Sequence, residues 1–61
     1  MTHSELKIFL KKNSCRKIRE GSSHEEWINE SNGRRFYVPR HSSKEMARGT
    51  VAAILKQAGL L

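Results

Sequence analysis

The sequence is poor in the features that would cross-link a small protein or hold it in a membrane. Its 61 residues include one cysteine, Cys15, so no internal disulfide can form, and a lone thiol is consistent with a reducing compartment. No apolar run approaches the roughly 20 residues that span a bilayer, and the N-terminus lacks a signal-peptide pattern. We therefore expect a soluble cytoplasmic protein in which Cys15 is a small buried side chain.

Acidic residues are also scarce relative to basic ones. Twelve Lys and Arg stand against six Asp and Glu, which gives a formal net charge of +6 and a pI near 10.1. This balance favours a polyanionic partner, nucleic acid first, although charge kept only for solubility is the alternative. There is no repeat, low-complexity segment or internal linker, so residues 1–61 are expected to form one domain of marginal stability.

The first segment has the pattern of an amphipathic helix. Thr2-His3-Ser4-Glu5 has the spacing of a capping box, which predicts a helix start at about residue 3. Leu6, Phe9 and Leu10 recur at i, i+3 and i+4, so we expect one apolar stripe in the core, Phe9 included. Asn13-Ser14 should end the helix.

Three strand-like runs follow, at 15–20, 24–29 and 34–39. Trp27 is the expected buried anchor of the second run, so the alternation of a strand turns His24, Glu26 and Ile28 toward the other face. In the first run, an inward Ile18 would place Lys17 and Arg19 together on that same outer face. This second assignment depends on one apolar residue.

Asn32-Gly33 is a hairpin signal that favours a two-residue type I′ turn. The register that this turn predicts places Trp27 opposite Val38, Asn29 opposite Phe36, and Ile28 opposite Tyr37. It gathers Phe36, Val38 and Trp27 on one face of the sheet. On the other face it gathers His24, Ile28, Arg35 and Tyr37, with Lys17 and Arg19 added. Continued further, the register would place His41 opposite His24, but Pro39 ends the strand.

The last segment predicts a second helix after a polar connection at 40–44. Val51, Ile54, Leu55 and Ala58 form its buried stripe, with a start at 49 or 50 and a glycine C-cap at 59. The predicted fold is α+β, in the order α-β-β-β-α. Each helix has one apolar face, so both should cover the same face of a three-stranded antiparallel sheet and leave the other face free.

The turn Gly21-Ser22-Ser23 delivers His24 to the start of a strand, between basic segments. An imidazole with a pKa of about 6.5 can accept a proton at neutral pH. In RNA the group to deprotonate is the 2′-hydroxyl, which then attacks the adjacent phosphate while Lys or Arg stabilises the developing charge. The alternative is that His24 only completes the turn.

Other constellations in the sequence are weaker. His3, Cys15, His24 and His41 lack the close paired spacing of a zinc site, and we expect neither a metal nor a cofactor. Glu25-Glu26 cannot act as a carboxylate pair, because neighbouring strand residues point to opposite faces. Glu26 alone could share a face with His24.

Almost the whole chain resembles the HicA family of bacterial toxins. The resemblance is carried by Ser4-Glu5-Leu6, Gly21-Ser22-Ser23-His24, Gly33-Arg34-Arg35, Val38-Pro39-Arg40-His41, and Gly49-Thr50 leading into Ala53-Ile54-Leu55-Lys56-Gln57-Ala58-Gly59. It implies a fold like that of double-stranded-RNA-binding domains, cleavage of mRNA, and neutralisation by a HicB-like antitoxin. It also implies that His24 is the catalytic histidine.

The chain departs from the family pattern at two places. Many relatives have a second histidine directly after the active one, whereas Glu25 stands here, so the general acid is unassigned. Relatives commonly have glycine and an aromatic residue where this chain has Ser14 and Cys15, which bears on the end of the first helix.

The leading hypothesis is a histidine-dependent, metal-independent endoribonuclease with His24 as general base. The expected RNA contacts are Lys17, Arg19, Ser22, Ser23, Arg35, Tyr37 and Arg40. Two alternatives stay open at this point: a nuclease-inactive RNA-binding module of the same fold, and a basic protein-interaction domain.

Overall fold

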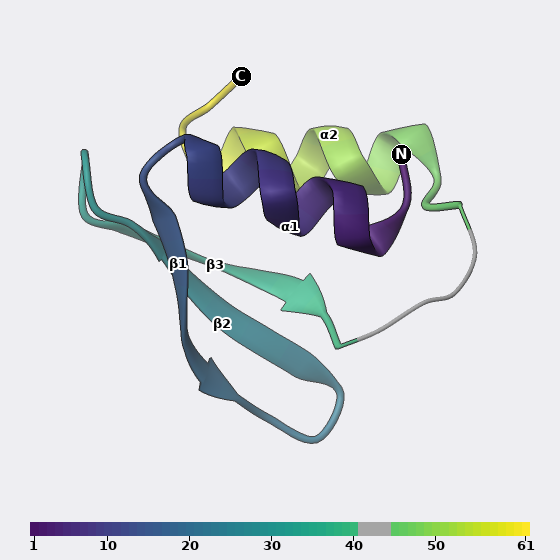
Figure 1. Ribbon diagram of the computed structural model, residues 1–61, viewed down its shortest axis with the longest axis horizontal. Coiled ribbons are helices and arrows are strands. Elements are labelled where there is room, and N and C mark those ends of the chain that lie inside the picture. Colours follow the sequence, from purple (N-terminus) through teal and green to yellow (C-terminus); the bar gives the residue numbers. More distant parts are fainter. Residues whose placement is uncertain (41–44) are drawn as a thin grey trace.

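The computed structural model describes residues 1–40 and 45–61 and has the expected order of elements. Helix α1 (His3–Lys12) precedes strands β1 (Cys15–Glu20), β2 (His24–Asn29) and β3 (Arg34–Pro39), and helix α2 (Arg48–Gln57) follows. The strands form one antiparallel sheet in the order β1-β2-β3, with both helices on one side of it (Figure 1). The predicted α+β architecture is confirmed. The expected polar connection after Arg40, including His41, lies outside the described residues.

Helix α1 begins as the sequence predicts. The Thr2 hydroxyl accepts a hydrogen bond from the Glu5 N–H at 3.2 Å, and the Glu5 carboxylate accepts one from the Thr2 N–H at 2.8 Å. At the other end the chain leaves the helix through Ser14, whose φ of 68° is in the left-handed region that favours glycine. A serine in this conformation carries a cost in backbone strain that a glycine would not.

The buried face of α1 is narrower than the sequence predicts. Leu6 and Leu10 are fully buried, but Phe9 is 37% exposed, so its assignment to the core was wrong. The third buried side chain is His3. Its Nε2 lies 2.7 Å from the carbonyl oxygen of Pro39 and donates to it, because a carbonyl oxygen only accepts. This bond ties the start of α1 to the end of β3.

The inner face of the sheet and the two helices enclose one apolar core. Its buried members are Leu6, Leu10, Cys15, Trp27, Phe36, Val38, Met46, Ile54 and Ala58. Trp27 is fully buried, stacks at a tilt on Phe36 with ring centroids 6.5 Å apart, and donates its indole N–H to Glu25 at 3.0 Å. The inward assignments of Trp27 and Cys15 are therefore confirmed.

The hairpin between β2 and β3 has the predicted faces but not the predicted register. Trp27 pairs with Phe36, Ile28 with Arg35, and His24 with Pro39, a shift of two residues from the expected pairing. The loop has four residues, 30–33, because the Asn29 carbonyl accepts from the N–H groups of Asn32 and Gly33 at 3.2 and 2.7 Å. A shift of two keeps every side chain on its predicted face.

Strand β1 contains an irregularity that the alternation did not predict. Lys17 pairs with Trp27 and Arg19 with Glu26, so Ile18 is an extra residue between them. Cross-strand partners share a face, which puts Arg19 on the outer face and Lys17 on the side of the helices. The prediction that Lys17 and Arg19 lie on the same face was wrong.

Helix α2 begins at Arg48, one residue before the predicted range, and ends in a Schellman motif. Leu60 N–H donates to the Leu55 carbonyl at 2.8 Å and Gly59 N–H to the Lys56 carbonyl at 3.1 Å. Gly59 has a φ of 76°, which confirms it as the residue that terminates the helix. No helix in residues 1–40 and 45–61 is long and apolar enough to cross a membrane.

Candidate active site

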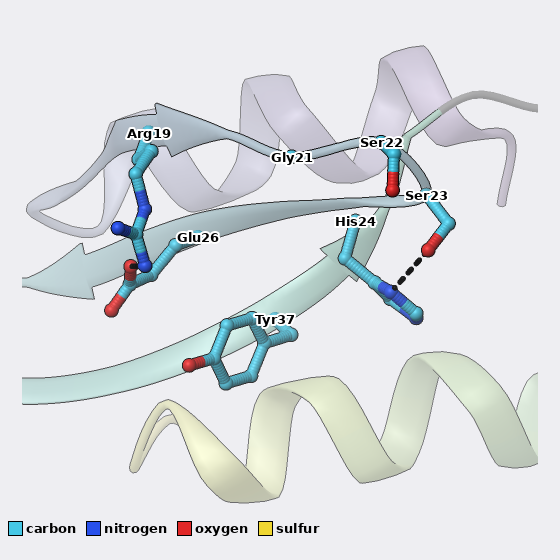
Figure 2. Close-up of a pocket in the computed structure, with 7 residues that line it drawn as sticks. All are labelled: Arg19, Gly21, Ser22, Ser23, His24, Glu26 and Tyr37. Carbon is cyan, nitrogen blue, oxygen red and sulfur yellow. Dashed lines mark hydrogen bonds and ion pairs between the residues drawn. The ribbon is translucent and has the colours of Figure 1, made fainter.

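The side chains of interest lie on the sheet face turned away from the core, which we call the open face. It carries Arg16, Arg19, His24, Glu26, Ile28, Arg35 and Tyr37, as the pairing of the strands requires. A hollow of about 460 Å³ lies at the end of this face where β1 turns into β2. Its lining residues are Arg19, Gly21, Ser22, Ser23, His24, Glu26 and Tyr37 (Figure 2).

The turn before His24 is closed by a short backbone bond. The Gly21 N–H donates to the His24 carbonyl at 2.8 Å. A Cβ atom at position 21 would stand 3.1 Å from that same carbonyl oxygen, closer than about nine in ten such contacts, so the backbone would have to shift slightly. Glycine therefore lets the two segments approach closely enough to set the position of His24.

Arg40 stabilises the turn at residues 21–23 by donating hydrogen bonds to its backbone. Its backbone N–H donates to the Ser23 carbonyl at 3.1 Å, and its guanidinium donates to the Ser22 carbonyl at 3.4 Å. The same guanidinium pairs with Glu20 at 2.9 Å, and Glu20 also accepts from Lys17 at 2.9 Å. The Lys17 hydrogen bond, helped by Arg40, lowers the pKa of the Glu20 carboxyl. Arg40 and Lys17 thus both pair with the Glu20 carboxylate at the edge of the site.

His24 is exposed at the mouth of the hollow. Its Nδ1 lies 3.1 Å from the Ser23 hydroxyl, which fixes the ring from one side (Figure 2). Nε2 has no hydrogen-bond partner in the described part of the chain, so it is open to a ligand. An imidazole held at one nitrogen and open at the other has the arrangement that a general base needs.

Glu26 lies two residues further along β2 and is the most enclosed charged group of the open face. Its side chain is only 10% exposed. One oxygen lies 3.0 Å from the guanidinium of Arg19 on β1, and the other 3.6 Å from that of Arg35 on β3. The carboxylate therefore bridges the two arginines across the middle strand.

Tyr37 stands directly across from Glu26 on β3 and is 54% exposed. Its ring lies beside both Glu26 and His24 (Figure 2). Tyr37 and His24 also border a second hollow, lined on its far side by residues of α2 such as Thr50, Ala53 and Gln57. The accessible surface around His24 therefore extends from β1 to α2.

The structure brings together most of the predicted site residues. Arg19, Ser22, Ser23, His24 and Tyr37 line one hollow, and Arg35 reaches it through Glu26. Lys17 lies outside the hollow, and the side chain of Arg40 is engaged with the turn and Glu20. Glu20, Gly21 and Glu26 were not predicted as site residues. For Glu26 the period-two pattern with His24 was a usable signal, whereas Glu20 gave none.

The described residues contain no group of three or more His, Cys, Asp or Glu side chains arranged to hold a metal ion. His3 is buried under Pro39, Cys15 is buried in the core, and His24 lies on the open face. These three residues, considered above as zinc ligands, are therefore dispersed. Burial raises the pKa of the Cys15 thiol, which keeps it in the neutral form.

Comparison with known proteins gives one family. The family described as "HicA toxin of bacterial toxin-antitoxin" matches residues 4–60. No significant match was found among curated proteins or among solved structures. The match runs from helix α1 to the end of the α2 cap and includes the whole His24 hollow. The chain therefore belongs to the HicA family of toxins of bacterial toxin–antitoxin systems.

Proposed function

We propose that this toxin is an endoribonuclease that cleaves mRNA with His24 as its general base. The observation that carries the proposal is the state of His24: exposed in a hollow on a cationic surface, fixed at Nδ1 by Ser23, and open at Nε2. The net charge of +6 favours a polyanionic substrate. Family membership supports a ribonuclease toxin in general, and the particular histidine is our assignment.

The reaction that fits this site begins at a ribose 2′-hydroxyl. His24 accepts the 2′ proton as the oxygen attacks the adjacent phosphorus, and the bond to the 5′ oxygen of the next nucleotide breaks. The products are a 2′,3′-cyclic phosphate and a 5′-hydroxyl. The leaving 5′ oxygen takes its proton from solvent water, because Glu25, the residue next to His24, is buried. This route uses no metal ion.

Phosphate recognition is assigned to the cations beside the hollow. Arg19 and Arg35 face the open side of the sheet and offer planar donors to phosphate oxygens. Lys17 lies on the helix side of β1 and adds positive charge without facing the hollow, and Ser22 and Ser23 supply short polar groups at the turn. Tyr37 supplies a half-exposed ring on which a base can stack. Arg40 acts on the turn rather than on RNA.

Membership of a toxin–antitoxin family implies that this protein has an antitoxin partner. We propose a HicB-like protein that binds it in the bacterial cytoplasm, where mRNA is available. A partner that binds only the folded toxin would raise its stability by about 2.7 kcal/mol when present at a hundred times its Kd. Such a shift in melting temperature is a direct test for a candidate antitoxin.

The cleavage chemistry is tested with chemically altered RNA. The full chain should cleave an all-ribose oligonucleotide in the presence of a chelator and leave a 2′,3′-cyclic phosphate, detected by mass spectrometry. Replacing the single ribose at the cleavage position by 2′-deoxyribose should stop the reaction without stopping binding. Continued cleavage at the deoxy position would contradict the proposal, and binding without any cleavage would instead favour a nuclease-inactive RNA-binding module.

A further inference from the structure

Glu26 is an anion built into a surface that is otherwise suited to phosphate. Its side chain lies in the wall of the His24 hollow and is 90% covered, with an arginine on either side. A carboxylate in this place repels phosphate groups, so it weakens non-specific binding of RNA. We propose that Glu26 reads a nucleobase, and that the hollow is a guanine subsite. This inference rests on the proposed RNA cleavage.

The carboxylate is fixed in place but not saturated. The guanidinium of Arg19 forms an ion pair with one oxygen at 3.0 Å, and that of Arg35 forms an ion pair with the other at 3.6 Å. Each contact occupies at most one acceptor site of its oxygen. An ionised carboxylate has about four lone-pair sites, so one acceptor site remains on each oxygen. Because the two arginines hold the group from neighbouring strands, these two remaining sites keep a constant direction.

Guanine is the base whose hydrogen-bond donors match the two oxygens of Glu26. Guanine presents two adjacent donors, N1–H and N2–H, on its Watson–Crick edge, and these match the two oxygens of a carboxylate. Adenine presents a donor beside an acceptor, and that acceptor would face a carboxylate oxygen. In single-stranded RNA this edge is free for recognition while the base stacks on an aromatic ring. Tyr37 is the cross-strand neighbour of Glu26 and offers such a ring, 54% exposed.

The distance between Glu26 and His24, the proposed general base, also suits a guanine subsite. His24 and Glu26 are two residues apart on the same face of β2, which is about 6.8 Å along a strand. A base held between Glu26 and Tyr37 therefore has its own ribose, or that of the next nucleotide, within reach of His24. Recognition and cleavage are then coupled through the rigid middle strand of the sheet.

The test compares three uridine-rich RNAs that differ at one position, which is guanosine, adenosine or inosine. Inosine lacks the N2 amino group and so tests that donor alone. The wild-type toxin should cleave beside guanosine about tenfold more efficiently, by kcat/KM, than beside adenosine, with inosine between them. In Glu26→Gln this ratio should fall to one or below, because an amide offers one acceptor and one donor, which match adenine and set a donor against one of the two guanine donors.

Glu30→Gln is the matched control. Glu30 also pairs with an arginine, Arg16, at 2.7 Å, but it lies in the hairpin loop outside the hollow. This variant should keep the tenfold preference. Equal cleavage of the three RNAs by wild type would overturn the guanine subsite. A uniform loss on all three RNAs in Glu26→Gln would also overturn it, because it would show that Glu26 only orients Arg19 and Arg35.

A binding measurement separates this inference from the proposed nuclease activity. The same three RNAs with 2′-deoxyribose at the cleavage position cannot react by the proposed route. Wild-type toxin should bind the guanine oligonucleotide about tenfold more tightly than the adenine one, by fluorescence anisotropy. That result would support the subsite even if no RNA were cleaved, and equal binding would contradict it even if cleavage were efficient. The comparison needs no variant, so it does not depend on Glu26→Gln being stable.

Discussion

Arg40 and Ser23 are joined by a backbone hydrogen bond of 3.1 Å, which connects the residue after β3 to the residue before His24. The guanidinium of Arg40 extends this connection to the Ser22 carbonyl and to Glu20. Arg40→Ala keeps the backbone bond and removes both side-chain contacts. We expect kcat to fall about tenfold because a loosened turn misplaces His24, while the melting temperature changes little, since exposed ion pairs contribute about 0–1 kcal/mol.

The salt dependence of RNA binding tells positioning by Arg40 apart from a phosphate contact. If Arg40 only holds the turn, the slope of log K against log salt is the same in Arg40→Ala and wild type. A slope about 0.7 less steep would show that Arg40 binds a phosphate of single-stranded RNA. Lys12→Ala, which removes an exposed charge in the last turn of α1 on the helix side of the sheet, should leave both kcat and the slope unchanged.

Binding of RNA should depend strongly on salt. Two phosphate contacts on the open face, from Arg19 and Arg35, give an expected slope of about −1.4 for a single strand. Arg19→Ala should make this slope about 0.7 less steep, which fluorescence anisotropy across a salt series would measure. A guanidinium has five N–H donors, so each arginine can keep its pair with Glu26 and also contact a phosphate. A slope near zero would show that Arg19 and Arg35 contact only Glu26 in the complex and no phosphate.

Trp27 is the residue on which the fold depends most. Truncation of a buried Trp costs about 3–5 kcal/mol, and a core of this size rarely supplies more than about 3–5 kcal/mol. Trp27→Ala should therefore be largely unfolded at 25 °C by circular dichroism. Tyr37→Ala, which truncates an aromatic ring on the open face, is the control and should remain folded. A cooperative melt of Trp27→Ala close to that of wild type would mean that Trp27 does not anchor the core.

A low pH should weaken the ion pairs of Glu20 with Lys17 and Arg40. The hydrogen bond from Lys17 lowers the pKa of the Glu20 carboxyl below its ordinary value of 4.5. A carboxyl whose pKa is lower in the folded state stabilises the fold above pH 4.5, and this contribution is lost as the pH falls through the folded-state pKa. Glu20→Gln should therefore flatten the decline in melting temperature below pH 4.5. A decline in melting temperature as steep as that of wild type would show that the ion pairs of Glu20 do not stabilise the fold.

The sequence was sufficient for the element order and for the faces of the sheet, because period-two and period-3.6 patterns report burial directly. It was insufficient for the hairpin register, because a contact far away in the chain decides the loop. Asn29 is fully buried, donates to the Ala58 carbonyl at 2.8 Å, and accepts from Ser31 at 3.0 Å. A local Asn-Gly signal contains no information about that contact with the end of α2.

The sequence predicted only part of the candidate site, and the reason is similar. His24 was indicated by a turn of recognisable composition, and Tyr37 by alternation along β3, and both assignments to the open face are confirmed. The sequence did not predict the extra residue at Ile18, so Lys17 was assigned to the wrong face, because one apolar residue alone does not specify a register. The roles of Glu20 and Arg40 come from side-chain contacts between distant segments, which spacing along the chain does not show.

The central claim is tested most directly by His24→Ala, with cleavage and thermal melting measured on the same preparation. The only described hydrogen bond of the imidazole is with the Ser23 hydroxyl, so its removal should leave the melting temperature unchanged and the binding of uncleavable RNA intact. Cleavage should fall by at least about a hundredfold, the lower end of what a general base contributes. A well-folded His24→Ala toxin that cleaves RNA at the wild-type rate would contradict the assignment of His24 as the catalytic base.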